Sequence, residues 1–136
     1  MNSSAIISTR TGFQKINQDG WIQFLDDFTR ENRGAHARLE IIGTNAEAGY
    51  QVETENRPFD GVSSDIKDGE SAVWITFGST MEDHLTHGVH EALAIRMSPA
   101  TENRGAMLEV EAADGSRTIL ELTLPDAYAL PPVEGR

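Results

Sequence analysis

The sequence predicts a mainly β (α+β) domain in which one N-terminal amphipathic helix is followed by about six mostly antiparallel strands. A single segment has the 3.6-residue period of a helix, several later segments alternate apolar and polar residues, and turns with glycine or aspartate separate those segments. We expect the strands to form a small barrel or strongly bent sheet, because closure removes exposed edges and lets the helix plug one open end. A flat sheet with the helix on one face is the alternative.

Chain length and composition predict one soluble globular domain. The chain has 136 residues, of which 38% are hydrophobic and 24% are charged, and a chain near this length can bury a core without disulfides. We assign residues 1–18 to an N-terminal tail, 19–124 to a single β-rich domain and 125–136 to a proline-rich C-terminal tail. The prolines favour an extended tail, with Tyr128 and Leu130 available to pack against the body.

Charge and residue content exclude several functional classes. The net charge is -11 and the basic residues are scattered along the chain, so we expect no nucleic-acid binding. The absence of cysteine excludes disulfides, thiolate zinc sites and thiol nucleophiles. Neither a secretory signal nor an apolar stretch of about 20 residues is found, so the sequence predicts a cytoplasmic protein without membrane contact.

The helix is predicted within "GWIQFLDDFTR". Its apolar residues fall at i, i+3, i+4 and i+7 and therefore share one face: Trp21, Phe24, Leu25 and Phe28. Asp19 is a candidate N-cap, and Gly34 stands where a residue in the left-handed conformation would end the helix. We interpret the aromatic stripe as core rather than as a ligand site.

Two antiparallel hairpins are predicted next. The segments "ARLEI" and "YQVET" alternate with a period of two, and Pro58 then interrupts the pattern. Across the turn "KDGE", a four-residue loop sets Val62 opposite Ile75, and Trp74 then points to the other face. The same register sets Ser64 opposite Val73 and Ile66 opposite Ser71.

The last hairpin depends on the length of its loop. A two-residue loop at Asp114 and Gly115 would divide the apolar positions between two faces. A three-residue loop with Gly115 in the left-handed conformation keeps them together, and we prefer it. This loop makes three cross-strand pairs: Leu108 with Leu120, Val110 with Thr118, and Glu111 with Arg117. One further strand is predicted from the alternation of Leu93, Ile95 and Met97.

The even spacing of His84, His87 and His90 makes them the candidate ligand-binding or metal site. Zinc takes about four ligands that converge on one point. In a strand, His84 and His90 would share a face about 20 Å apart, while His87 would point the opposite way with its neighbours at i−2 and i+2. A helix over residues 79–92 would bring neighbouring imidazoles together in pairs but not all three, and only a sharp bend at Gly88 could gather the triad.

Signals for other chemistry are weak. The sequence has no phosphate-binding glycine loop, no dinucleotide fingerprint, no nucleophile elbow and no EF-hand loop. Asp83 could orient His84 toward Ser79 or Thr86 as a nucleophile, but adjacent residues of a strand face opposite ways. We therefore predict no catalytic residues and no cofactor, with zinc or another transition metal at the histidines as the alternative.

The sequence accordingly favours a non-enzymatic binding or protein-interaction module. Its β surface or barrel mouth would contact an unknown protein or a small ligand, and a homodimer could form through an exposed strand. The competing hypothesis is a metal-dependent protein that uses His84, His87 and His90.

Four segments carry a resemblance to a known family: "GWIQFLDDFTR", "YQVETENRPFDGVSSDI", "DHLTHGVHEALAIRM" and "LEVEAADGSRTILEL". In order and spacing, from Trp21 to Leu124, the chain resembles a family of small bacterial proteins known as domain of unknown function 5335. The region from Glu91 to Ala94 lacks a proline that the family pattern would place there. The resemblance implies one compact, mainly β domain with strand, turn and strand over residues 83–97, and it brings no assigned activity.

Overall fold

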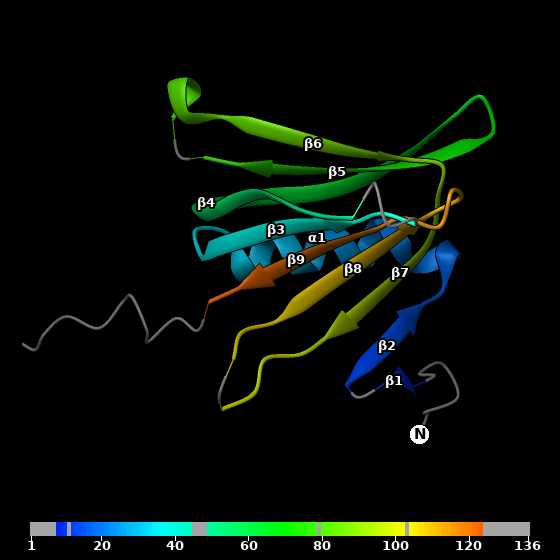
Figure 1. Ribbon diagram of the computed structural model, residues 1–136, viewed down its shortest axis with the longest axis horizontal. Helices are drawn as coiled ribbons and strands as arrows, with labels where there is room; N and C mark the ends of the chain where they lie inside the picture. The colour runs from blue at the N-terminus through cyan, green and yellow to red at the C-terminus, as the bar shows by residue number, and fades with distance from the viewer. Residues whose placement is uncertain (1–7, 11, 45–48, 79, 103, 124–136) are drawn as a thin grey trace, which may run out of the picture.

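The computed structural model describes residues 8–10, 12–44, 49–78, 80–102 and 104–123, which form one mainly antiparallel sheet and one α-helix (Figure 1). The elements are β1 (Ser8–Arg10), β2 (Phe13–Ile16), the 3₁₀ turn η2 (Gln18–Gly20), α1 (Trp21–Asn32), β3 (His36–Ile42), β4 (Tyr50–Lys67), β5 (Glu70–Phe77), the 3₁₀ turn η3 (Met81–Asp83), β6 (Leu85–His90), β7 (Ala92–Ser98), β8 (Met107–Ala112) and β9 (Arg117–Leu122). The strands are hydrogen-bonded in the order β1-β2-β7-β8-β9-β3-β4-β5-β6.

The mainly β class is confirmed, but three details of the prediction are wrong. The described residues form nine strands rather than about six, and β1 and β2 precede the helix, within residues 1–18 that we had assigned to a tail. Among the described residues the sheet does not close into a barrel, because its two edge strands, β1 and β6, do not pair with each other. The expected C-terminal tail at 125–136, with Tyr128 and Leu130, lies outside the described residues.

The helix packs through the predicted apolar face. Trp21, Leu25 and Phe28 are buried, and the Trp21 indole N–H donates to the Ile16 carbonyl at 3.1 Å. The N-cap is Gly20 rather than Asp19, which lies in η2. Gly34 adopts the predicted left-handed conformation with φ of 95°. No helix among the described residues has both the length and the apolar character needed to span a membrane.

Strand β4 explains why the sheet bends. We predicted that Pro58 would separate two strands, but one 18-residue strand continues through it. Its first half pairs with β3 and its second half pairs with β5. The register shifts on both sides of Pro58, and Asn56 has a positive φ of 63°. Such irregularities increase the local bend and twist of a strand, so the two halves can face different directions (Figure 1).

Both later hairpins have the predicted registers. Val62 pairs with Ile75, and Leu108 pairs with Leu120 across a loop in which Gly115 has φ of 90°. The prediction for the strand of Leu93 is wrong in one respect. The register shifts between Ala92 and Ala94, which leaves Leu93 59% exposed and on the opposite side from Ile95.

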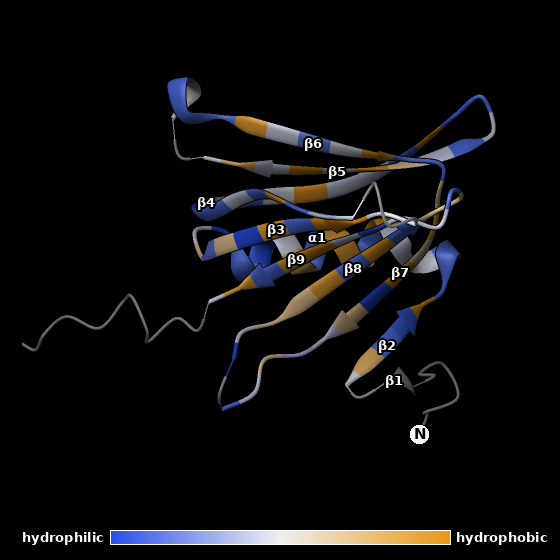
Figure 2. Cartoon of the chain, in the orientation of Figure 1, coloured by the Kyte–Doolittle hydropathy of each residue, from blue (hydrophilic) through white to orange (hydrophobic). Residues whose placement is uncertain are grey.

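A single apolar core lies between α1 and the inner face of the bent sheet. Buried side chains from the helix and from β3 to β9 form one cluster. Figure 2 shows hydrophobic and hydrophilic residues alternating along these strands. Parts of β5 and β7 approach within 8 Å between Cα atoms although four strands separate them in the sheet. The core therefore holds the strongly curved sheet around the helix.

The opposite face of the sheet carries a nearly buried ionic network. Glu109 is 3% exposed, and its carboxylate lies 3.4 Å from Arg96 Nη1 and 3.8 Å from Arg117 Nη1. Arg96 Nη1 also lies 3.0 Å from Glu111. The network is built on paired strands, because Arg96 pairs with Glu109 and Glu111 pairs with Arg117, as predicted for the latter pair.

Candidate interaction edge

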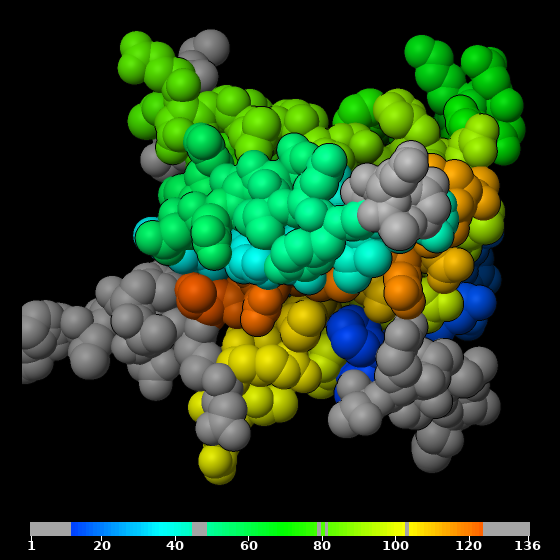
Figure 3. All heavy atoms as spheres, in the orientation of Figure 1, coloured from blue at the N-terminus to red at the C-terminus, as the bar shows by residue number. Residues whose placement is uncertain are grey.

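Residues 84–90, which contain His84, His87 and His90, lie at the β6 edge of the sheet. The η3 turn begins after Thr80, whose side-chain hydroxyl accepts the Asp83 N–H at 3.2 Å, and β6 follows directly. β6 pairs with β5 along its whole length and with no other strand of the described residues. In the space-filling view β6, in light green, lies along the upper border of the molecule (Figure 3). The strand and turn interpretation of residues 83–97 is therefore confirmed.

His84 lies just before β6 and faces the bend of β4. Its side chain is 47% exposed, and Nε2 lies 3.8 Å from Oδ2 of Asp60. Asp60 is also held near Arg33 Nε at 3.8 Å. The His84 imidazole can therefore gain an ionic partner when it is protonated, but it shares that carboxylate with an arginine.

His87 points toward the core side of the sheet. It pairs with Ile75, and its neighbours Leu85 and Val89 pair with Phe77 and Val73, all of which are buried on β5. The side chain is half-buried because β6 is the last strand. Burial lowers the pKa of His87, the charge of His90 lowers it further, and Glu53 opposes the shift. The imidazole is therefore neutral at neutral pH.

His90 lies on the outer face with Trp74. The two rings meet edge to face, with centroids 5.4 Å apart and planes at 89°. Trp74 also pairs with Gly88, and its indole lies directly over that glycine. Glycine leaves room for the ring, so the indole, the glycine and His90 together form a packed outer surface on the last two strands.

The structure does not bring the three imidazoles together. His87 faces the core side with Leu85 and Val89, whereas His90 contacts Trp74 on the outer face and His84 contacts Asp60 before the strand begins. Within the part of the chain that is described, no group of three or more histidine, aspartate or glutamate side chains has the arrangement of a metal site. His87 and His90 show the alternation that the strand interpretation predicted, whereas His84 lies before the strand, and β6 continues through Gly88.

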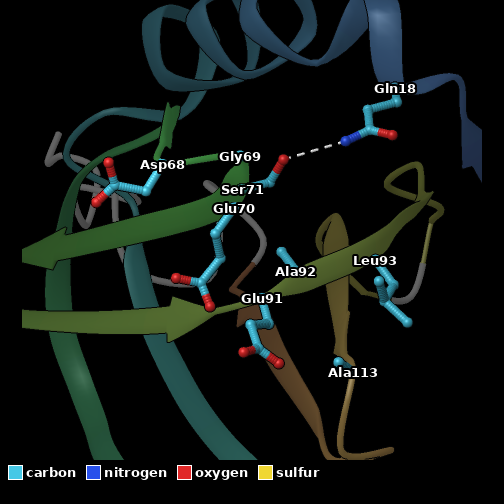
Figure 4. A pocket seen from close by; sticks show the side chains of 9 residues that line it. All are labelled: Gln18, Asp68, Gly69, Glu70, Ser71, Glu91, Ala92, Leu93 and Ala113. Atoms are coloured by element: carbon cyan, nitrogen blue, oxygen red, sulfur yellow. Dashed lines mark hydrogen bonds between the residues drawn. The ribbon is translucent and has the colours of Figure 1, made fainter.

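An acidic hollow lies at the end of β6, where the chain turns into β7 (Figure 4). It has a volume of about 570 Å³ and is bounded by η2, the turn between β4 and β5, and the loop after β8. Gln18 donates to Ser71 Oγ at 3.1 Å across one side. Interaction with the Glu70 carboxylate raises the pKa of Glu91, with a smaller contribution from Asp114. The hollow therefore repels anions.

The corner between β6 and β7 is a single residue. Glu91 has φ of 53°, and its carbonyl accepts the Ala113 N–H at 2.9 Å. This conformation turns the chain from the last strand of the sheet to a strand near the opposite edge. Proline cannot adopt a positive φ. A proline in place of Glu91 would therefore be incompatible with this corner.

Comparison with protein families gives one match. Residues 12–132 match the Family of unknown function (DUF5335). The chain belongs to DUF5335. The match covers nearly all of the described domain and confirms the resemblance of the four segments. Comparisons with curated proteins and with solved structures gave no match, so DUF5335 membership brings no catalytic residue or ligand with it.

Several residues around the edge could not be selected from the sequence. Asp60 and Glu53 act on His84 and His87 from β4, more than twenty positions away in the chain. Trp74 was expected on the outer face, but its contact with His90 depends on the pairing of β5 with β6. Within residues 84–90 themselves, the alternation of side chains between the two faces of the strand was the local signal that the sequence offered.

Proposed function

We propose that this DUF5335 protein is a non-enzymatic interaction module that binds an extended segment of a partner protein along the free edge of β6. One observation carries the proposal. β6 is a six-residue edge strand whose residues include no lysine, arginine, aspartate, glutamate or proline. Proteins usually protect such edges with charges, prolines, bulges or very short strands. The other edge, β1, has only three residues.

The chemistry of an edge strand favours addition of another strand. Backbone N–H and C=O groups on the free side of β6 need partners, and a bound segment would supply them by main-chain hydrogen bonds. Selectivity would come from alternate side chains. Leu85 and His87 would lie beside one face of the bound segment, and Thr86 and His90 beside the other.

Charge favours a basic partner segment over a second copy of the chain. The chain has a net charge of -11, so two copies would repel each other at low ionic strength. Carboxylates also lie near both ends of the edge, since Asp60 contacts His84 and Glu91 follows β6 directly. We therefore propose an extended segment with lysine or arginine residues, and treat a homodimer as the competing arrangement.

The experiment uses displayed random peptides selected against the full chain. A selected basic peptide is then titrated into ¹⁵N-labelled protein, and amide hydrogen exchange is measured with and without it. We expect chemical-shift changes and new amide protection along β6. Changes that lie only in the acidic hollow, or binding that does not involve β6, would contradict the proposal and favour a small-ligand site. Sedimentation of the free protein tests the homodimer.

Two proline variants give a matched control within the same strand. Neighbouring N–H groups of a strand point to opposite sides, so one of Thr86 and His87 donates toward β5 and the other toward the free edge. Of Thr86→Pro and His87→Pro, one should therefore lose stability and the other should keep the fold. The variant that retains its unfolding midpoint must lose peptide binding. Full binding by that variant would reject the edge as the binding site.

A further inference from the structure

A second surface feature is a groove between α1 and the loop that joins β7 to β8, with a volume of about 370 Å³. Its helical wall contains Phe24, Asp27, Phe28 and Glu31, of which the last three lie three, four and seven residues after the first. Side chains at this spacing share one face of a helix, so the groove follows α1 for about two turns. β6 supplies none of the described lining residues, and the groove is therefore separate from the edge proposed above.

The helical wall has an apolar column and an acidic column. In the apolar column, the rings of Phe24 and Phe28 meet edge to face with centroids 6.0 Å apart. Phe28 is buried and its ring also meets the Phe59 ring, at 5.8 Å, so the floor of the groove continues into the core. Asp27 and Glu31 form the acidic column. Within each column the two residues are one turn, about 6 Å, apart along the helix axis.

The opposite wall is apolar and is tied to the sheet by a backbone hydrogen bond. Met97, Pro99, Ala100 and Ala106 line it. The Ala106 carbonyl accepts the Leu122 N–H at 3.0 Å, which joins the end of the loop to β9. This wall is therefore formed in the free chain. A groove that is already ordered costs a partner less entropy than one that must form on binding.

The groove carries uncompensated negative charge. Arg30 pairs with Asp27, but the exposed carboxylate of Glu31 has neither an ion pair nor a hydrogen bond within the described part of the chain. Arg104, the basic residue of the loop, donates instead to Ser98 Oγ at 2.6 Å and is not among the lining residues. The lining therefore favours a partner that combines apolar side chains with positive charge.

We propose that this groove binds an amphipathic helix of a partner protein, with two apolar side chains one turn apart against Phe24 and Phe28 and with lysine or arginine beside Glu31. The two columns and the charge together select this occupant. A helix presents two adjacent columns of side chains on one face, at the same spacing as those of α1, whereas an extended strand presents a single row on each face. A second copy of the chain would bring another net charge of -11 to the same site.

The test uses a library of alanine-rich helical peptides in which two leucines one turn apart and lysines in the adjacent column, on either side, are fixed and the other positions vary. Peptides selected on the full chain are titrated into ¹⁵N-labelled protein. We expect chemical-shift changes in α1 and in the loop between β7 and β8. Replacing the two leucines by alanine should weaken binding by about tenfold or more, because the groove then receives no large apolar side chain.

Glu31→Lys and Asp65→Lys give a matched pair of protein variants. Both replace an exposed carboxylate by an ammonium group, but Asp65 lies on β4 outside the groove. Glu31→Lys should weaken binding by about tenfold or more, and Asp65→Lys by about twofold or less. Lysine in the last turn of α1 also suits the helix dipole, so Glu31→Lys should remain folded. A peptide with glutamate in place of the fixed lysines should regain affinity for Glu31→Lys.

Several outcomes would overturn the proposal. The patterned library could yield no binder, the chemical-shift changes could be confined to β6 or to the acidic hollow, or the two lysine variants could have equal effects. Sedimentation that shows a dimer dissociated by Glu31→Lys would assign the groove to a second copy instead. Nuclear Overhauser contacts between the groove and another segment of the same free chain would also reject a partner helix.

Discussion

The indole of Trp74 lies so close to Gly88 on the neighbouring strand that a Cβ atom at position 88 would come within 2.4 Å of the ring. The two residues are direct cross-strand partners. The indole covers the backbone that the glycine leaves bare, and it also meets the His90 ring edge to face. The contact between Trp74 and Gly88 therefore determines the surface of the outer face of β6, the strand that we propose to bind a partner.

Gly88→Ala should lower the free energy of unfolding by about 1–3 kcal/mol, because the new methyl group would displace the indole. Urea denaturation measures the change. In a Trp74→Ala background the same substitution should be neutral or stabilising, because alanine is the better strand residue once the ring is gone. An equal loss in both backgrounds would show that the indole is not the cause.

His87 should make the protein less stable at mildly acidic pH. Its pKa is lowered in the folded state, chiefly by burial. The neutral form is favoured by folding, so the stabilisation is complete above the unfolded pKa of about 6.5 and is lost as pH falls through the lower folded value. His87→Leu should flatten the pH profile of the urea midpoint in this window. His84→Gln should retain the wild-type slope, and an unchanged slope in His87→Leu would contradict the assignment.

Hairpin registers could be predicted from the sequence, because they depend on the alternation of apolar residues and on the residues of the turn. Alternation and turn chemistry gave the pairing of Val62 with Ile75 and of Leu108 with Leu120, because a shift of one residue would have exposed the apolar side chains. The same alternation separated His87 from His84 and His90. These predictions needed no knowledge of which distant segments meet.

The remaining features depend on long-range contacts. Pro58 looked like a strand end, but it lies where β4 changes partner, and the bend there cannot be read from composition. The pairing of β2 with β7 joins segments about eighty residues apart, so a short "FQKI" segment gave no strand signal alone. Leu93 was predicted to alternate regularly with Ile95 and Met97 because nothing nearby marks the irregularity between Ala92 and Ala94.

Removal of Glu109 should be strongly destabilising. The Glu109 side chain is 4% exposed and lies beside the Arg96 side chain, which is 14% exposed and whose Nε has no partner among the described residues. Glu109→Ala would remove the more deeply buried of the two carboxylates beside Arg96 and leave only Glu111 as its counter-charge, with an expected loss of about 3 kcal/mol in unfolding free energy. The double variant Arg96→Met with Glu109→Leu should regain most of that loss. If the single and double variants are equally unstable, packing rather than charge is responsible.

Zinc should not stabilise the protein. His87 faces the core side while His90 packs on Trp74, so the three imidazoles of the segment cannot converge on one ion. Thermal unfolding of untagged protein should have the same midpoint with and without added zinc. Stoichiometric zinc in the purified protein, lost in His87→Ala but retained in His36→Ala, would instead support the metal-dependent alternative.

Glu91→Gly should stabilise the protein, because Glu91 is held at φ of 53° at the corner between β6 and β7. The left-handed conformation costs a residue with a side chain about 1–2 kcal/mol, whereas glycine adopts it without this cost. The unfolded glycine chain has more freedom, which offsets part of the gain. We expect a net increase of about 1 kcal/mol in the free energy of unfolding.

Glu91→Gln separates the charge at this corner from the backbone conformation. The neighbouring Glu70 raises the pKa of Glu91, so the folded state binds its proton more tightly than the unfolded state does. Stability is therefore highest below the unfolded pKa and falls as pH rises through the higher folded value. Glu91→Gln should remove this fall, and its advantage over the wild type should be larger at neutral pH than at acid pH. Urea midpoints measured at both pH values test this, and a constant advantage would exclude repulsion from Glu70.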